Sequence, residues 1–298
     1  MSHAATQPHL RRSFLFVPGS DERKLTKAPG LGADAIILDL EDGVAAARKR
    51  EARANIQAFL QGQHDRSAEC FIRVNGIGTP HFEADLEAAA GAGPRVLVIP
   101  KVDSPQILQR IDARLTEMER ASGVPPGSFE LFAQIESARG ILNAAAIASA
   151  TPRLVGVMLG HVDLCVDLGI PAGRAGEGII YQAGCQLVLA AKAVGVDVVD
   201  SIYLNIQDHE GLRVEAAQAA ALGFTGKLAI HPGQLPVIHK AFTPSAEQVR
   251  RAERILEAWR QAESEGRGVC TLDGDLIEKP VAEAERRVLE RAKRAERS

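Results

Sequence analysis

Short apolar runs recur along the chain, separated by amphipathic, alanine-rich segments. Within the runs, apolar and polar residues do not alternate, which indicates strands buried on both faces, as in a parallel sheet. Strand and helix patterns alternate eight times, and this predicts a parallel (β/α)8 TIM barrel, with a doubly wound sheet as the alternative. The eight predicted strands are residues 13–17, 35–40, 70–74, 95–99, 130–135, 154–159, 197–202 and 227–230.

Helical patterns fill the intervals and continue beyond the last strand. We expect a barrel over residues 11–243 and a C-terminal extension over residues 244–298. Within the extension, a Gly- and Asp-containing stretch at 266–280 predicts a hairpin or lid. The predicted helices are residues 45–60, 82–92, 104–122, 140–148, 177–194, 210–222, 245–263 and 282–296.

Composition excludes several kinds of partner. The net charge of -3 over 298 residues gives no reason to expect nucleic acid or an anionic membrane surface. No apolar run is long enough for a membrane span, and the polar first ten residues lack the apolar core of a signal peptide. The four cysteines are scattered, without a CxxC pair, and are typical of reduced thiols. We therefore expect a cytoplasmic protein.

The second predicted strand ends in a cluster of acids. Asp39, Glu41 and Asp42 follow the buried run directly, and Gly43 closes the turn. Carboxylates crowded together repel one another, so a divalent cation or a cationic side chain is expected beside them. The alternative interpretation is a solvated acidic loop.

Polar side chains also follow the other predicted strands. In a barrel, catalytic groups lie at the carboxyl ends of the strands, so these side chains are expected to converge on one mouth. Their number favours a functional site, although each one alone is unremarkable. They are Arg73 and Asn75, Lys101, Glu136, His161 and Asp163, Asp200 and Ser201, and His231.

Two of these carboxylates could bind a metal ion. Glu136 and Asp163 end adjacent strands and could hold Mg²⁺, leaving its other positions to water and substrate oxygens. Asp39 and Glu41 could then orient metal-bound water. The alternative is that Glu136 caps a helix and Asp163 lies in a solvated turn.

Two cations accompany the acids. Arg73 has the planar geometry that suits a substrate carboxylate or an enolate oxygen, or it could form an ion pair with the acidic cluster. Lys101 could contact substrate or balance the same acids.

The chain has no GxSxG, no GxxxxGK[ST] and no strand-linked GxGxxG motif. The mouth therefore suits 2-oxo or 2-hydroxy acids, with a carbon–carbon bond made or broken through an enolate.

The chain resembles the citrate lyase β-subunit-like members of the HpcH/HpaI aldolase group, which include citryl-, malyl- and citramalyl-CoA lyases. The similarity extends from about residue 12 to about residue 289. It rests on LFVPGS at 15–20, GADAIILDLEDGV at 32–44, RVNGIGTP at 73–80, PKV at 100–102, QIESARG at 134–140, GHVDLCVDLG at 160–169 and LGFTGKLAIHPGQ at 222–234.

This resemblance implies a Mg²⁺-dependent TIM barrel in which Glu136 and Asp163 match the metal ligands. Arg73 matches the arginine that holds the substrate carboxylate or oxyanion, and Asp39 and Glu41 match the acids beneath the metal. In the family, the C-terminal segment covers a neighbouring subunit's site, so a homo-oligomer, a trimer or hexamer, is expected. Its DGxMID-type motif ends in an acid/base Asp; this chain has DGDLIE at 273–278, ending in Glu278.

The expected activity is cleavage or formation of a 2-hydroxyacyl-CoA thioester, such as citramalyl-, malyl- or citryl-CoA, with a 2-oxo acid and an acyl-CoA as the partners. The expected metal is Mg²⁺, with Mn²⁺ as an alternative ion. Coenzyme A enters as part of the substrate, and Arg23, Lys24 and Lys27 could hold its phosphates or form a solvated helix face. Two alternatives are a metal-dependent aldolase acting on free pyruvate and an aldehyde, and a non-catalytic lyase-like subunit.

Overall fold

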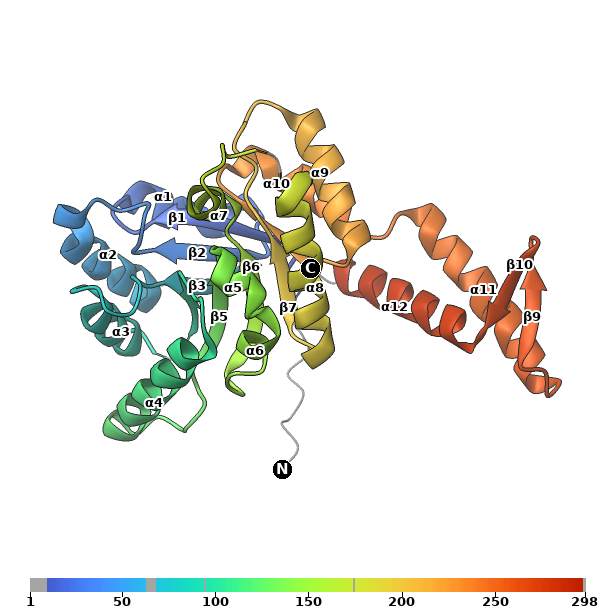
Figure 1. Ribbon diagram of the computed structural model, residues 1–298, viewed down its shortest axis with the longest axis horizontal. Helices are drawn as coiled ribbons and strands as arrows, with labels where there is room; N and C mark the ends of the chain where they lie inside the picture. The colour runs from blue at the N-terminus through green and yellow to red at the C-terminus, as the bar shows by residue number, and fades with distance from the viewer. Residues whose placement is uncertain (1–9, 63–67, 94, 174, 297–298) are drawn as a thin grey trace. The chain divides into compact units, whose positions relative to one another are not determined.

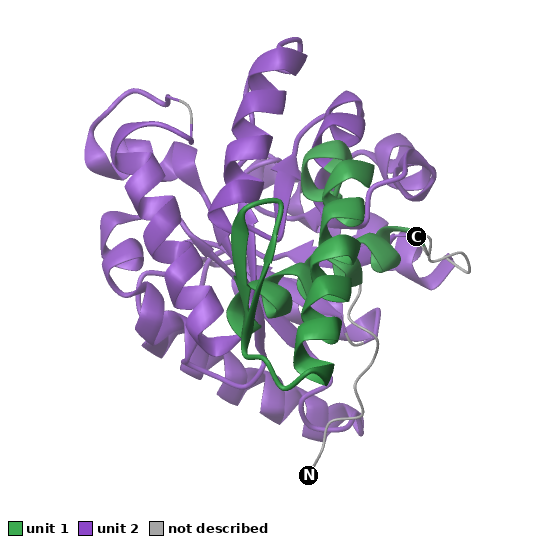
Figure 2. Ribbon diagram, turned by 90° about the vertical axis from the view of Figure 1, so that its right-hand side faces the viewer, with its two compact units in different colours: residues 1–10, 239–298 green, residues 11–238 purple. Residues whose placement is uncertain are grey.

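The computed structural model describes residues 10–62, 68–93, 95–173 and 175–296. The chain divides into two compact units, which Figure 2 colours separately. The larger unit spans Arg11–Ile238, and the smaller one combines Met1–Leu10 with His239–Ser298.

The larger unit is a closed barrel of eight parallel strands in sequence order, with β8 paired back to β1. The predicted TIM barrel is therefore confirmed. All five residues of β2 are buried, as the unalternating apolar run requires. The strands are β1 (Ser13–Pro18), β2 (Ala35–Asp39), β3 (Glu69–Arg73), β4 (Val96–Ile99), β5 (Glu130–Ile135), β6 (Leu154–Leu159), β7 (Asp197–Asp200) and β8 (Gly226–Ala229).

Helices surround the barrel (Figure 1). The predicted helix at 140–148 is wrong in one respect: it is two short helices that meet at Asn143. The backbone of Asn143 leaves the helical region, and its side-chain amide donates to the carbonyl of Asp103 at 2.8 Å. The helices are α1 (Glu22–Lys27), α2 (Lys49–Gly62), α3 (Phe82–Gly91), α4 (Pro105–Ser122), α5 (Ala138–Leu142), α6 (Ala144–Ala148), α7 (His161–Leu168), α8 (Gly178–Val194), α9 (His209–Leu222) and α10 (Leu235–Phe242), with 3-10 turns η1 (Ala28–Leu31), η2 (Ala46–Arg48) and η3 (Pro232–Gln234).

Aromatic rings fill the interior of the barrel towards the end where the strands begin. Phe14, Phe71 and Phe132 are fully buried, with ring centroids 5.2–5.8 Å apart in edge-on and tilted arrangements. On β6, Gly156 provides space for the ring of Phe132, since a Cβ there would lie 2.1 Å from a ring carbon. The Arg11 guanidinium lies 5.5 Å from two of the ring centroids. This packing leaves the opposite end of the barrel to form the site.

The smaller unit contains α11 (Ala246–Ser264), the antiparallel strands β9 (Val269–Leu272) and β10 (Asp275–Glu278), and α12 (Lys279–Ala295). The predicted hairpin is present. Its two-residue turn, Asp273–Gly274, has positive φ angles of 53° and 90°, as an Asp-Gly hairpin turn requires. Ile255, Trp259, Ile277 and Ala282 form a small core of its own. Within the described residues, no helix combines the length and apolarity needed to cross a bilayer.

A buried ion cluster joins α4 to the start of β6. Arg153 donates to both carboxylate oxygens of Glu119 at 2.7 Å, to Thr116 Oγ1 at 2.9 Å and to Asp112. Burial acts to raise the pKa of Glu119. The Arg153 guanidinium and the N–H groups of Gly127 and Phe129 outweigh it and hold the pKa at about 2.

We expect Glu119→Gln to lower the free energy of unfolding at pH 7 by about 3 kcal/mol, because a pKa depressed from its ordinary 4.5 to about 2 stabilises the folded state by that order. This stabilisation is present above pH 4.5 and is lost as the pH falls towards 2. Urea unfolding at several pH values tests it, with exposed Glu117→Gln on the same helix as the control. A constant difference between Glu119→Gln and wild type across this range would contradict the prediction.

Candidate active site

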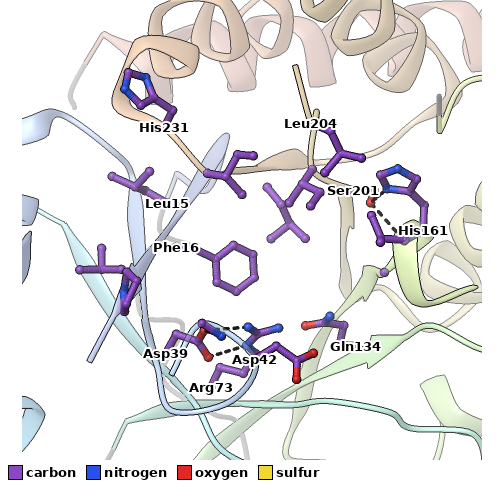
Figure 3. A pocket seen from close by; sticks show the side chains of 18 of the residues that line it. Leu15, Phe16, Asp39, Asp42, Arg73, Gln134, His161, Ser201, Leu204 and His231 are labelled. Atoms are coloured by element: carbon purple, nitrogen blue, oxygen red, sulfur yellow. Dashed lines mark hydrogen bonds and ion pairs between the residues drawn. The ribbon is translucent and has the colours of Figure 1, made fainter. Parts of the chain in front are cut away.

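A cavity of about 780 Å³ opens at the carboxyl ends of the barrel strands. Figure 3 shows Arg73, Asp39 and Gln134 along one side and His161 with Ser201 on another, while Phe16 occupies the middle. Apolar side chains supply much of the remaining wall, which is typical of small-molecule sites. These wall residues include Leu15, Leu159, Ile202, Leu204, Leu228 and Ile230.

Asp39, the last residue of β2, organises the acidic turn, which we define as residues 39–43. Its Oδ1 accepts from the N–H of Glu41 at 2.8 Å, and its Oδ2 accepts from the N–H of Gly43 at 2.9 Å. The same two oxygens accept from Arg73 Nε at 2.7 Å and Nη2 at 2.8 Å, a two-pronged pair across neighbouring strands. Both oxygens of Asp39 are thus engaged within the protein.

Arg73 ends β3 and lines the cavity although it is only 8% exposed. Its guanidinium carbon lies 4.6 Å from the centroid of the Phe16 ring, and Nη1 lies 3.1 Å from Glu41 Oε2. Burial acts to lower the pKa of Arg73, but hydrogen bonding to Asp39 and the charges of Asp39 and Glu41 raise it overall. A guanidinium has five N–H groups, so two remain beyond the three contacts to Asp39 and Glu41.

Lys101, after β4, connects the acidic turn to the next strands. Its Nζ donates to Glu41 Oε1 at 2.7 Å and lies 3.6 Å from Asp42, while its backbone N–H donates to Glu136 Oε1 at 2.7 Å. The residue adopts a left-handed φ of 55°, which is strained for a lysine and places both groups on the acids. Lys101 is exposed and does not belong to the cavity lining, and its contacts are with Glu41 and Glu136.

Glu136 follows β5 and is 5% exposed. Its other oxygen, Oε2, accepts from the Gln134 amide at 2.6 Å, and the carboxylate packs against Gly160, where a Cβ would lie 2.5 Å from Oε2. Burial, followed by the charges of Asp163 and Glu41, raises the pKa of Glu136 to about 7. Burial and the neighbouring carboxylates thus outweigh the hydrogen bonds that Glu136 accepts from the Lys101 N–H and the Gln134 amide.

Asp163 lies in the first turn of α7 and lines the cavity, and its charge raises the pKa of Glu136 more than the charge of Glu41 does. Neither carboxylate has a salt bridge within the described part of the chain. No three His, Cys, Asp or Glu side chains group there as a complete metal site. Two carboxylates without a salt bridge nevertheless fit Mg²⁺, which prefers oxygen ligands and usually keeps several waters. A cation there would favour the ionised form of Glu136.

Gln134 is a site residue that the sequence analysis did not single out. It lines the cavity, and its Oε1 is buried without a hydrogen-bond partner in the described part of the chain. Glu41 Oε2 also accepts no hydrogen bond there, but it forms an ion pair with Arg73 Nη1 at 3.1 Å. Unpartnered buried oxygens are rare, so Gln134 Oε1 marks a place where a ligand or ordered water completes the hydrogen bonding.

The histidines have structural partners. His161 is 1% exposed, its Nδ1 contacts Ser201 Oγ, and its backbone N–H donates to the same oxygen at 3.2 Å. Burial and the charge of Lys227 lower the pKa of His161. Lys227, fully buried on β8, donates to Asp200 at 2.5 Å and to Glu215 at 2.9 Å. His231 is exposed and accepts from the N–H of Gly233 at 3.1 Å.

Of the three basic residues expected to hold phosphates, two line the cavity and one does not, because they point in different directions from helix α1. Lys24 and Lys27, three positions apart on α1, line the cavity, whereas Arg23 is exposed and does not belong to the lining. Glu278, in the smaller unit, is exposed at the end of β10 and stands at the N-cap of α12 without a capping hydrogen bond. Its place relative to a barrel mouth stays a prediction.

A TIM barrel that gathers carboxylates and an arginine at the carboxyl ends of its strands has the architecture of a TIM-barrel enzyme. The family model described as HpcH/HpaI aldolase/citrate lyase matches residues 12–232, and the chain belongs to this family. The resemblance inferred from the motifs is confirmed.

Individual relatives bear different names. The chain is 39% identical to the citrate lyase subunit beta of Haemophilus influenzae, covering 95% of this chain and 97% of that protein. It is 42% identical to the (3S)-malyl-CoA thioesterase of Cereibacter sphaeroides, covering 92% of each. Among solved structures, it is similar to the CitE protein of Mycobacterium tuberculosis in complex with magnesium, acetoacetate and coenzyme A, with a TM-score of 0.78, 35% identity, and coverage of 95% and 98% of the two chains.

Proposed function

We propose that this protein is a Mg²⁺-dependent carbon–carbon lyase that cleaves or forms the CoA thioester of a 2-hydroxy acid. The malyl, citramalyl and citryl thioesters are the substrates to examine. The observation that carries the proposal is one cavity that Asp163 lines together with a guanidinium that has unused donors, Arg73, while the buried carboxylate of Glu136 lies next to the lining residues Gln134 and Gly160. The magnesium and coenzyme A bound by the M. tuberculosis CitE protein support it.

Glu136 and Asp163 would hold the ion, with Mn²⁺ as an alternative. When bound, Mg²⁺ supplies a Lewis acid for the hydroxyl or oxo oxygen of the substrate. Arg73 donates its two remaining N–H groups to the substrate carboxylate and to the oxygen that gains negative charge during cleavage. Asp39 and Glu41 fix the guanidinium in this orientation from behind, and Lys101 fixes Glu41 and Glu136.

The CoA part of the substrate needs a cationic rim. Lys24 and Lys27 supply two ammonium groups at the edge of the cavity, and we propose that they pair with the phosphates. Arg23 lies outside the lining and is left out of this role. The four cysteines are free thiols, which agrees with the cytoplasmic location that we propose.

Protonation of the enolate of the departing acyl-CoA is assigned to Glu278 of a neighbouring subunit, in a trimer or hexamer. Mixing inactive Glu136→Ala subunits with inactive Glu278→Ala subunits should restore part of the activity after exchange, because some mixed sites contain both intact carboxylates. Subunit exchange is verified separately by mass. No recovery despite exchange would place the action of Glu278 within its own subunit or remove it from catalysis.

Glu278→Asp is the companion variant, since it restores the residue that is typical of the family's motif. We expect it to retain activity if the segment lies as in the relatives. The side chain is shorter by one methylene, and a displacement of about 1 Å can cost about 100-fold in rate, so loss of activity would show that the site is built around the longer acid.

A second candidate is hydrolysis of the thioester, and the 42% identity to the (3S)-malyl-CoA thioesterase favours it. The two reactions have different products. A lyase releases a 2-oxo acid and keeps the thioester bond, whereas a thioesterase releases free CoA thiol and leaves the 2-hydroxy acid intact. Assaying malyl-CoA in parallel with a carbonyl reagent and a thiol reagent distinguishes them. Thiol release without 2-oxo acid would replace the lyase proposal by the hydrolase.

A further inference from the structure

Lys49 is a buried cation with no assigned role. It is the first residue of α2 and is only 8% exposed. Its Nζ donates to the carbonyl of Leu40 at 2.8 Å, to the carbonyl of Glu41 at 2.8 Å and to Asn75 Oδ1 at 2.7 Å. An ammonium has three protons, so all of them are used, and none of the three acceptors is a carboxylate.

Two of these acceptors belong to the acidic turn. Asp39 already fixes the turn from inside by accepting from the N–H groups of Glu41 and Gly43. Lys49 fixes the same turn by donating to the carbonyl groups of residues 40 and 41. The peptide groups that carry Glu41 are therefore held from both sides, with a positive charge on the carbonyl side.

Asn75, the third acceptor of the Lys49 ammonium, is itself held by further hydrogen bonds. Its Nδ2 donates to the Leu40 carbonyl at 2.9 Å and to Asp85 Oδ2 at 2.5 Å, and its backbone N–H donates to Asp85 Oδ2 at 2.8 Å. Asp85 is fully buried and accepts from Arg53 at 2.9 Å. The orientation of Asn75 is thus determined by α2 and α3, and Asn75 in turn directs Lys49 to the turn.

We propose that Lys49, supported by Asn75, is a positioning residue that fixes the acidic turn and, through Asp39, the direction of the Arg73 guanidinium in the cavity. Neither Lys49 nor Asn75 lines the cavity, so neither touches substrate. A lysine suits this position because its compact ammonium can reach three oxygens at once, which a planar guanidinium cannot do in the same way. The effect of Lys49 on turnover rests on the function proposed above, whereas its effect on the turn does not.

Two variants and one control test this proposal. Lys49→Met removes the ammonium and keeps much of the volume, and Asn75→Ala is the milder change in case Lys49→Met folds poorly. Glu119→Gln is the control, because it destabilises the barrel through a buried polar residue at its other end. The readouts are steady-state kinetics with the wild-type thioester substrate and hydrogen exchange at the amides of Glu41 and Gly43.

We expect kcat of Lys49→Met to fall about 100-fold, the cost of a displacement near 1 Å in a catalytic group, while KM changes by less than about threefold. The Glu41 and Gly43 amides should exchange at least about tenfold faster in both variants and at the wild-type rate in Glu119→Gln. A loss of kcat in Glu119→Gln equal to that in Lys49→Met would overturn the proposal, as would unchanged exchange. Faster exchange with full kcat would overturn it too. If wild-type protein turns over no thioester, the proposed function fails, and the exchange rates alone decide whether Lys49 holds the turn.

Discussion

Glu136→Gln is expected to abolish Mg²⁺-dependent turnover, with a loss of at least about 1000-fold in kcat/KM, because it removes one of two carboxylates from a metal site worth several kcal/mol. The variant keeps the shape of the buried side chain. Its new amide N–H group can meet Gln134 Oε1, which lacks a partner within the described residues, after the Gln134 amide turns over. Folding should therefore persist, and calorimetric titration should show loss of Mg²⁺ binding.

The matched control is Glu130→Gln, which makes the same change at the opposite end of the same strand, β5. It should bind Mg²⁺ and turn over substrate as wild type does. Wild-type kcat/KM in Glu136→Gln would contradict the assignment of Glu136 as a ligand. Asp163→Asn should resemble Glu136→Gln, since the two carboxylates act on one ion.

Arg73→Lys is expected to cost about 2–4 kcal/mol of transition-state stabilisation, the range for removing a preorganised donor from an oxyanion site. Lysine keeps the charge but cannot make the two-pronged contact to Asp39 at 2.7 and 2.8 Å while also reaching Glu41 and substrate. The loss should appear in kcat/KM as about 30- to 1000-fold.

Arg12 offers a matched control for this change. It makes the same kind of two-pronged contact, with Asp34, from Nε at 2.9 Å and Nη2 at 2.8 Å, before the first two strands begin. Arg12→Lys loses comparable geometry at the other end of the barrel, so it should lower stability without changing kcat/KM. Equal kinetic effects of the two substitutions would show that Arg73 only balances charge.

The barrel was predictable because its strands are buried on both faces and so read as apolar runs. Predicted and observed strand ends agree closely, as at 130–135 for β5. The break at Asn143 was not predictable, because it depends on a contact with the backbone of Asp103, which is distant in sequence. A helical pattern of residues cannot show such a tertiary contact.

Much of the candidate site was also predictable, because catalytic groups in a barrel lie at the carboxyl ends of the strands. Asp39, Arg73 and Asp163 line one cavity, and Glu136 lies directly behind Gln134 and Gly160. A position at the end of a strand does not determine which partners a side chain has. Lys101, predicted to contact substrate or acids, contacts Glu41 and Glu136 because its backbone takes a left-handed conformation.

Two buried lysines were not predicted from the sequence. Lys49 begins an amphipathic helix, where a lysine ordinarily faces water, and only the structure shows its three buried acceptors. Lys227 did give a signal, since it is a charged residue inside a buried strand, and a buried charge requires partners, here Asp200 and Glu215.

The most direct test of the central claim measures 2-oxo acid release from malyl-, citramalyl- and citryl-CoA, with Mg²⁺ and with excess chelator. We expect that at least one thioester yields a 2-oxo acid and an acyl-CoA in equal amounts, that chelator stops the reaction, and that added Mg²⁺ restores it. Release at the full rate in chelator, or release of CoA thiol without any 2-oxo acid, would contradict a magnesium-dependent carbon–carbon lyase.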